Sequence, residues 1–328
     1  STLSSSSAAS DVYKRQPLVF AEGSSTKLRI QSALSLDEPS ESIQVDDGSL
    51  ILLAPVNLNA GTLGANGGTV RFEQGVTLNG GNLAVSNSKL VIGNQFAKSG
   101  GMVNFTGTGL ELLSDLSLTS DTLLSFESLD LKQKKLTLSN AESDIELKSQ
   151  LRMDDPNEAL ISGDADLKLN QGFSIDEGLI SSTSGTVSIN ASSSLTNNGT
   201  LSLSLGTLAL GGDFLKNGGS LSIGDSTFKL LSNLNWTSDS LLEVSALDLN
   251  NLCRDCDGLH KHVTDNSLML AGSVDVRSQE YPQLFSQRLA LAVARSLGAT
   301  PLEPTINVDT KAAAGRHARR QSGGRVLE

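Results

Sequence analysis

The chain gathers its two cysteines and two of its three histidines in one short segment. Cys253-x-x-Cys256 is followed by His260 and His262, so two thiols and two imidazoles lie within ten residues. Tetrahedral zinc sites use these ligand atoms, although the spacing matches no established zinc finger. In an exported protein, a C-x-x-C pair instead favours a small disulfide loop. The sequence leaves open a Cys253–Cys256 disulfide, free thiols and a zinc site; we expect the disulfide and predict no cofactor.

A second group of residues with catalytic potential is acidic and lies in the middle of the chain. Polysaccharide lyases and glycosidases gather carboxylates on one face, often beside a basic residue or Ca²⁺. The candidates are Asp144, Glu146, Asp154, Asp155, Asp164 and Asp166, with Lys148, Arg152 and Lys168 nearby. However, acidic residues that alternate with Leu or Ile also form the solvated face of a strand. No stack of aspartates recurs at a fixed period, and no Gly-Gly-x-Gly-x-Asp repeat is present, so we predict no catalytic residue and no enzyme.

An internal repeat positions these residues. Residues 81–133 align without a gap onto residues 199–251, an offset of 118, and 21 of 53 positions are identical. Chance identity in a chain this rich in Ser, Leu and Gly is roughly a tenth, so the match reflects an architectural period. Such a period predicts an elongated stack rather than a globule around a pocket. Leu118 and Trp236 are equivalent in the repeat, so we expect them to point the same way within their turns.

Within the repeat, apolar residues alternate with small polar ones, which indicates strands with one buried face. One such run contains Leu201, Leu203, Leu205, Leu208 and Leu210. Glycine-led openings such as Gly61-Thr-Leu and Gly81-Asn-Leu often lie 13 to 20 residues apart, and 118 residues divide into six turns of just under 20. Pro156 is the only proline between residues 56 and 281, so almost every N–H in that stretch can join a ladder.

These features predict an all-β chain, a right-handed parallel β-helix (β-solenoid) of ten to twelve turns with a short α-helical C-terminal segment. The helix is expected within residues 281–297, where apolar residues follow a 3, 4, 7, 8 spacing, and it would cover the open end of the stack. The alternatives are a pair of immunoglobulin-like sandwiches, an outer-membrane barrel and disorder. An aromatic content of 4% and a hydrophobic content of 38% in strict alternation favour the solenoid.

Composition divides the chain into four parts. In residues 1–21, residues 4–16 resemble translated sequencing-adapter read-through, and Val19 and Ala21 fit the cleavage positions of a signal-peptide remnant, with a short strand as the alternative. Residues 22–252 form the predicted β-solenoid. Residues 253–310 form a break segment with the capping helix, and the basic residues 311–328 form a disordered tail.

Three motifs in the C-terminal part are Thr264-Asp265-Asn266, Ser286-Gln-Arg288-Leu-Ala-Leu and Asp309-Thr310 with Ala314-Gly-Arg316. Their order resembles the peptidoglycan-binding domain related to outer-membrane protein A. The resemblance implies that Asp265 and Arg288 hold the diaminopimelate carboxylates. The spacing between this aspartate and this arginine is longer than in that family, and the glycine-rich strand before the last motif is absent. The resemblance covers about 65 of the 328 residues.

The solenoid, with its Gly-Thr-Leu and Asn-Gly-Thr-Leu-Ser-Leu turns, resembles the passenger regions of bacterial surface adhesins of the filamentous-haemagglutinin and autotransporter type. The resemblance implies a secreted or outer-cell-surface adhesin or stalk without chemistry of its own, whose partner is a host or environmental surface glycan or protein. A net charge of −11 argues against nucleic acid as the partner, and no run of 18 apolar residues predicts a transmembrane helix. The alternatives are a β-helix polysaccharide lyase or glycosidase, and a solenoid carrying a degenerate peptidoglycan-binding segment.

Overall fold

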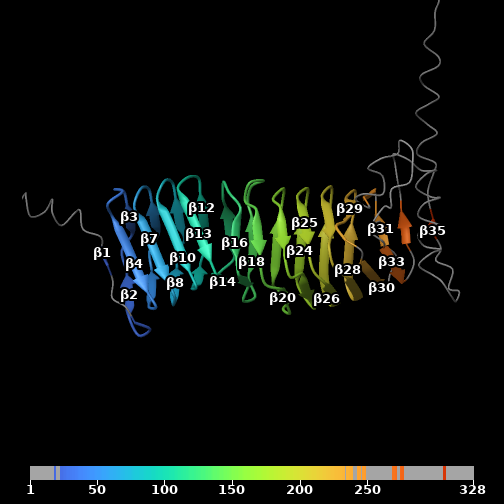
Figure 1. Cartoon of the computed structure of the whole chain (residues 1–328), viewed down its shortest axis with the longest axis horizontal. Helices are drawn as coiled ribbons and strands as arrows, with labels where there is room; N and C mark the ends of the chain where they lie inside the picture. Colours follow the sequence, from blue (N-terminus) through green and yellow to red (C-terminus); the bar gives the residue numbers. More distant parts are fainter. Residues whose placement is uncertain are drawn as a thin grey trace, which may run out of the picture.

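In the computed structural model the chain winds into a parallel β-solenoid of about ten turns (Figure 1). The structure describes residues 23–232 in full, and the backbone alone of the strands at 18–19, 234–238, 242–244, 246–248, 268–271, 274–276 and 306–307. Every element in these parts is a strand, and paired strands run parallel, which confirms the predicted all-β solenoid. The helix expected within residues 281–297 lies outside the described residues. Right-handed winding stays a prediction from the handedness of parallel crossovers.

Each turn contains three short strands that form three faces of a prism. The first turn consists of β2 (Lys27–Ile30), β3 (Leu34–Leu36) and β4 (Ser42–Asp46), and we number the faces first, second and third in that order. The second turn consists of β5 (Ser49–Leu52), β6 (Val56–Leu58) and β7 (Thr62–Asn66). The ladders pair Ser42 with Thr62 and Thr62 with Asn82, which are 20 residues apart. This spacing agrees with the predicted length of a turn.

The remaining strands extend these three faces. On the first face lie β8 (Thr69–Phe72), β11 (Lys89–Ile92), β14 (Gly109–Leu112), β17 (Ser128–Asp130), β20 (Leu151–Met153), β23 (Phe173–Ile175) and the first halves of β26 (Ser193–Leu203) and β28 (Phe214–Ile223). On the second face lie β9 (Val76–Leu78), β12 (Gln95–Lys98), β15 (Leu116–Thr119), β18 (Lys135–Leu138), β21 (Ala159–Ser162), β24 (Leu179–Ser182) and the second halves of β26 and β28. On the third face lie β10 (Asn82–Ser86), β13 (Met102–Thr106), β16 (Leu124–Phe126), β19 (Ile145–Leu147), β22 (Leu167–Leu169), β25 (Thr186–Ile189), β27 (Thr207–Leu210) and β29 (Thr227–Leu230).

Short strands at both ends complete the described backbone. β1 (Leu18–Val19) pairs with β4. Beyond β29 lie β30 (Leu234–Ser238), β31 (Leu242–Val244), β32 (Ala246–Asp248), β33 (Leu268–Ala271), β34 (Val274–Val276) and β35 (Ile306–Asn307).

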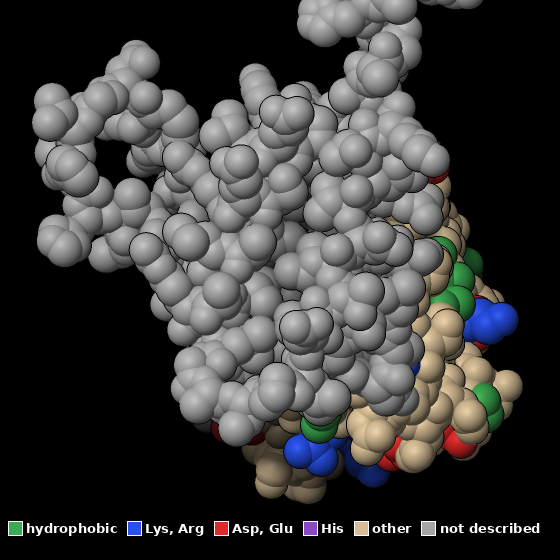
Figure 2. Space-filling model, turned by 90° about the vertical axis from the view of Figure 1, so that its right-hand side faces the viewer, with side chains coloured by type: hydrophobic (Ala, Val, Ile, Leu, Met, Phe, Trp, Pro, Cys, Tyr) green, Lys and Arg blue, Asp and Glu red, His purple; other side chains and the backbone are tan. Residues whose placement is uncertain are grey.

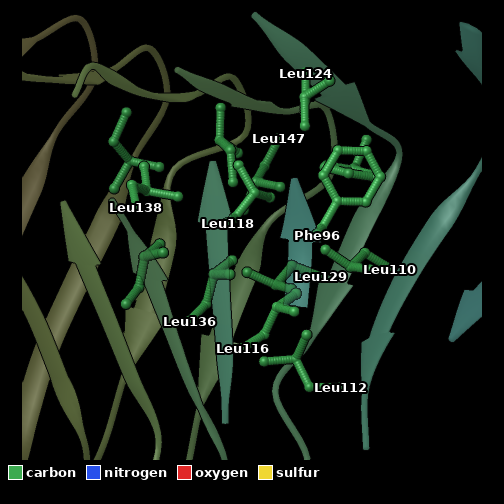
Figure 3. Packing of buried hydrophobic residues seen from close by; sticks show 14 of the residues in the cluster. Phe96, Leu110, Leu112, Leu116, Leu118, Leu124, Leu129, Leu136, Leu138 and Leu147 are labelled. Carbon is green, nitrogen blue, oxygen red and sulfur yellow. The ribbon is translucent and has the colours of Figure 1, made fainter. Parts of the chain in front are cut away.

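The core is a continuous column of apolar side chains inside the prism. Leu50, Val70 and Leu90 follow one another on the first face, and all three are completely buried. Figure 3 shows Leu116 and Leu136, from adjacent strands of the second face, entering the same interior. Because each inward residue stacks on its equivalent in the next turn, every added turn buries more apolar surface. Each Å² buried stabilises the fold by about 25 cal/mol, so the stabilisation accumulates turn by turn.

The corner between the third and first faces requires a left-handed backbone. Asp47, Gly67, Asn87 and Gly107 stand 20 residues apart at φ 56°, 76°, 48° and 60°. Glycine and asparagine adopt this conformation at least cost. A Cβ on Gly67 would also lie 2.2 Å from Oδ1 of Asp47, one turn earlier, so the side chain of Asp47 would have to move.

Leu205 departs from the alternation that the sequence predicts. It belongs to the run of leucines expected to point inward, yet it lies on a corner at φ 65° and is 66% exposed. Leu205 is the repeat equivalent of Asn87, so the second copy keeps the left-handed corner but places a leucine there. The alternation of leucine with small residues thus continues through Leu205, although this residue lies at a corner and not in a strand.

The sequence repeat maps strands onto strands but moves each to a neighbouring face. β10 of the third face maps onto the second half of β26 on the second face, and β11 of the first face maps onto β27 of the third. The offset spans 17 strands, counting each half of β26 as one, whereas six turns require 18, so the prediction of six turns is wrong by one strand. Leu118 consequently lies on the second face, while the backbone of Trp236 pairs with Phe214 on the first. The two equivalent residues therefore lie on different faces, and the expectation that their side chains point the same way within their turns stays a prediction, because the side chain of Trp236 lies outside the described residues.

Two of the three faces are interrupted within residues 23–232. On the third face no ladder joins β13 to β16, and on the first face none joins β17 to β20. We call these interruptions the third-face seam and the first-face seam. The second face runs without interruption from β3 to β28, so it alone carries backbone pairing past both seams.

Candidate functional surfaces

The predicted ligand residues of the C-terminal part lie outside the described residues. These are Cys253, Cys256, His260 and His262 of the disulfide or zinc alternatives, and Asp265 and Arg288 of the peptidoglycan resemblance. Their roles stay predictions. Within the part of the chain that is described, no group of three or more His, Cys, Asp or Glu side chains is placed to hold a metal ion.

The structure divides the candidate catalytic carboxylates between two separate edges of the prism. Asp144, Glu146 and Asp166 lie at or just before β19 and β22 on the third face. Asp154 and Asp155 follow β20 and so lie at the corner between the first and second faces. The six carboxylates therefore do not converge on one site.

Glu146 is the most strongly perturbed of these groups. Its carboxylate accepts hydrogen bonds from Nζ of Lys168 at 2.7 Å, from Nδ2 of Asn170 at 2.8 Å and from Oγ of Ser125 at 3.0 Å. The hydrogen bond from Lys168, followed by that from Asn170, lowers the pKa of Glu146 to about 2. A carboxyl with this pKa is ionised at neutral pH, so it cannot serve as the general acid of a glycosidase.

The aspartates of the same edge bind backbone amides of neighbouring turns. Oδ1 of Asp144 accepts the N–H of Asp166 at 2.7 Å, and Oδ1 of Asp166 accepts the N–H of Thr186 at 2.6 Å. Asp164 accepts the hydroxyl of Ser184. Asp144 and Asp166 thus occupy one column in successive turns, where Leu123 precedes them and Thr186 follows them. At these corners the carboxylate oxygens accept backbone N–H groups of the next turn, so they act as structural hydrogen-bond acceptors.

Lys98 is the feature that the sequence reasoning missed. Its side chain points inward, in the position of the column that Leu58 and Leu78 fill in earlier turns, and the residue as a whole is only 4% exposed. Its ammonium forms an ion pair with Asp121 of the next turn. Beside this pair, Oγ of Ser143 accepts the N–H of Ser120 at 2.9 Å. A buried charge with a partner in the next turn ties two turns together at a corner.

The internal repeat carried a signal for this pair. Lys98 recurs as Lys216, which is also buried and donates to the carbonyl of Gly218 at 3.1 Å. Asp121 recurs as Asp239, which lies outside the described residues. Many outward strand residues differ between the two copies, among them Glu111, which becomes Lys229. Identity at a lysine and an aspartate one turn apart was therefore a sign that these two residues interact.

The outer surface of residues 23–232 exposes no aromatic ring, and its only arginines are Arg29, Arg71 and Arg152. All of its phenylalanines are buried, and this part of the chain contains no Trp or Tyr. Its exposed large hydrophobic residues are Met102, Leu123, Leu205, Leu215 and Leu231. Where described side chains are visible in Figure 2, hydrophobic and charged ones are scattered among uncharged polar ones. Binding hot spots concentrate in Trp, Tyr and Arg, so this surface is poor in anchors.

The described turns define the class of the protein as a parallel β-solenoid. No family model, no curated protein and no solved structure matches the chain. Among the described residues, no helix has the length and apolar character needed to cross a membrane.

Proposed function

We propose that the chain is a non-catalytic, exported β-solenoid that serves as the stalk of an attachment structure at the outer surface of a bacterium. The observation that carries this proposal is the commitment of polar side chains to the rod itself. The carboxylates of the third-face edge bind neighbouring turns, and Lys98 binds Asp121. The resemblance of the solenoid to adhesin passenger regions supports export and attachment.

A stalk accounts for the described surface better than a binding tip does. A tip that grips a surface glycan or protein needs a cluster of anchoring side chains, usually aromatic or Arg. Residues 23–232 bury every aromatic ring they contain. We therefore assign contact with the glycan or protein partner to regions other than the faces of these turns, while the turns supply length.

Surface display is tested with an antibody raised against residues 23–232. On intact cells of the natural host, the antibody should bind, and protease added outside the cells should remove the signal while a cytoplasmic marker survives. Detection only after the cells are broken open would overturn export.

The absence of catalysis is tested on acidic glycans, which are the substrates of the β-helix lyases and glycosidases that form the alternative. Incubation of the purified chain with pectin or alginate should release neither unsaturated uronate nor reducing ends. Release that is lost in the Asp144→Asn or Asp154→Asn variant, but kept in the variant Ser188→Ala of an outward serine, would establish the enzyme instead.

A further inference from the structure

The two seams divide the rod into three stacks of fully paired turns. At the third-face seam, β13 is the last strand of one sheet and β16 is the first strand of the next. Inside the seam the rings of Phe105 and Phe126 stack with their centroids 5.0 Å apart. At its far corner the N–H of Glu127 donates to the carbonyl of Thr108 at 2.8 Å. Ring packing and one corner bond thus replace a ladder.

The near end of the third-face seam is held by the buried Lys98. Lys98 lies at the end of β12, just before the corner that leads to β13, and its partner Asp121 lies at the equivalent corner before β16. The side chain of Asp121 is 36% exposed, whereas that of Lys98 is 3% exposed. Breaking the pair would leave a buried ammonium without its counter-charge, which is costly.

The first-face seam has a buried charge of its own. Glu158 is 7% exposed and lies at the corner before β21. Its Oε1 accepts the N–H of Gln133 from the preceding turn at 3.4 Å, and its Oε2 accepts the N–H of Asp154 at 3.1 Å. Lys98 and Glu158 are thus two buried charges, one at each seam, each with a partner in an adjacent turn. At each seam, therefore, a buried charged side chain makes a polar contact close to the place where two strands of successive turns are not paired.

We propose that the two seams are joints of the rod, and that the Lys98–Asp121 pair is the latch of the third-face seam. At each joint one face opens while the continuous second face acts as the hinge. Because the seams lie on different faces, the two joints bend the rod in different directions. This property belongs to the fold, so it holds or fails independently of whether the rod is displayed on a cell.

Hydrogen exchange on the full chain, read by mass spectrometry, tests the joint. Peptides that cover β13 and β16 should exchange at least about tenfold faster than peptides that cover β7 and β10, which lie on the same face with ladders on both sides. Peptides of β12 and β15, on the hinge face, should stay protected. Equal protection of β13, β16, β7 and β10 would overturn the joint without the need for any variant.

The latch is tested by the variants Asp121→Asn and Lys98→Met. Both should accelerate exchange in β13 and β16 several-fold and leave β7 and β10 unchanged, with the larger effect from Asp121→Asn because it leaves the ammonium unpaired. The matched control is Glu111→Gln, since the Lys89–Glu111 pair joins the same two turns on the first face, where β11 and β14 are fully paired. Unchanged exchange in both latch variants, or equal acceleration in the control, would refute the latch.

Discussion

At the scale of single residues, charged side chains connect successive turns through hydrogen bonds and ion pairs. Glu146 is 16% exposed and binds three donors, of which Lys168 and Asn170 come from the following turn. Ion pairs on a fully solvated surface contribute little, but a carboxylate with several charge-assisted hydrogen bonds contributes more. The stability of the rod should therefore depend on such carboxylates, and hence on pH.

The variant Glu146→Gln tests this dependence. The pKa of Glu146 is lowered from 4.5 to about 2 in the folded chain, so its contribution to stability is complete above pH 4.5 and is lost as the pH falls through about 2. At pH 7 we expect Glu146→Gln to lower the free energy of unfolding by about 1 kcal/mol.

Urea titrations between pH 7 and pH 2 measure this effect. The difference between the natural chain and Glu146→Gln should shrink below pH 4.5. Glu142→Gln is the control, because Glu142 is exposed on the corner before β19 and should not affect the urea midpoint. A difference between the natural chain and Glu146→Gln that is the same at every pH would contradict the role given to the charge.

At the scale of strands and corners, the alternation of apolar residues predicts what is inside but not which face a strand occupies. Leu90 and Leu110 lie in the buried column as their spacing indicates. β26 is assigned as one strand across the corner between the first and second faces, and that corner is marked by Asn197 at φ 45° and a register shift between Asn197 and Thr200. Leu205 and Lys98 escaped prediction because backbone handedness and a partner one turn away, rather than alternation, decide their places.

Leu205 offers a test of the statement that glycine and asparagine suit the left-handed corners best. A leucine in the left-handed conformation costs about 1 kcal/mol relative to a residue that tolerates it, and its exposed side chain contributes little burial in return. The variant Leu205→Asn restores the residue that the first copy carries at this corner, so we expect a gain of about 1 kcal/mol in the free energy of unfolding. Leu215→Asn is the control, because this leucine is exposed on β28 without positive φ. An equal gain there would show that the gain comes from removing an exposed leucine and not from the left-handed corner.

Removal of one complete turn tests the independence of the turns. Deletion of residues 69–88 takes out β8, β9 and β10 and joins Gly68 to Lys89, so β11 stacks on β5 with every inward residue in place. The shortened chain should fold with a circular dichroism spectrum of the same shape, since each turn depends mainly on its neighbours.

The deletion of residues 109–127 is the comparison, because it also removes one turn but takes Asp121 and Phe126 away from the third-face seam. It should lower the thermal midpoint more than the deletion of residues 69–88 does. Equal losses in the two shortened chains would show that the seam has no special need of these residues.

At the scale of the whole molecule, parallel stacking fixes the shape. Successive turns are separated by one strand spacing, about 4.8 Å, so ten turns form a rod of about 48 Å. Figure 1 shows these turns following one another along the long axis. Circular dichroism should be dominated by β-structure, and small-angle scattering should give the pair-distance distribution of an elongated particle. A helix-dominated spectrum or the scattering of a compact sphere would contradict the rod.

The misfit between the 17 strands of the repeat and the three strands of a turn bears on how such chains grow. A duplicated block of 17 strands rotates every later strand about the axis by two thirds of a revolution. The repeated block is therefore not a whole number of turns, since 17 strands fall one short of six turns of three. The 17-strand repeat and the three-strand turn are therefore out of step, so residues that are equivalent in the two copies of the sequence lie on different faces of the rod.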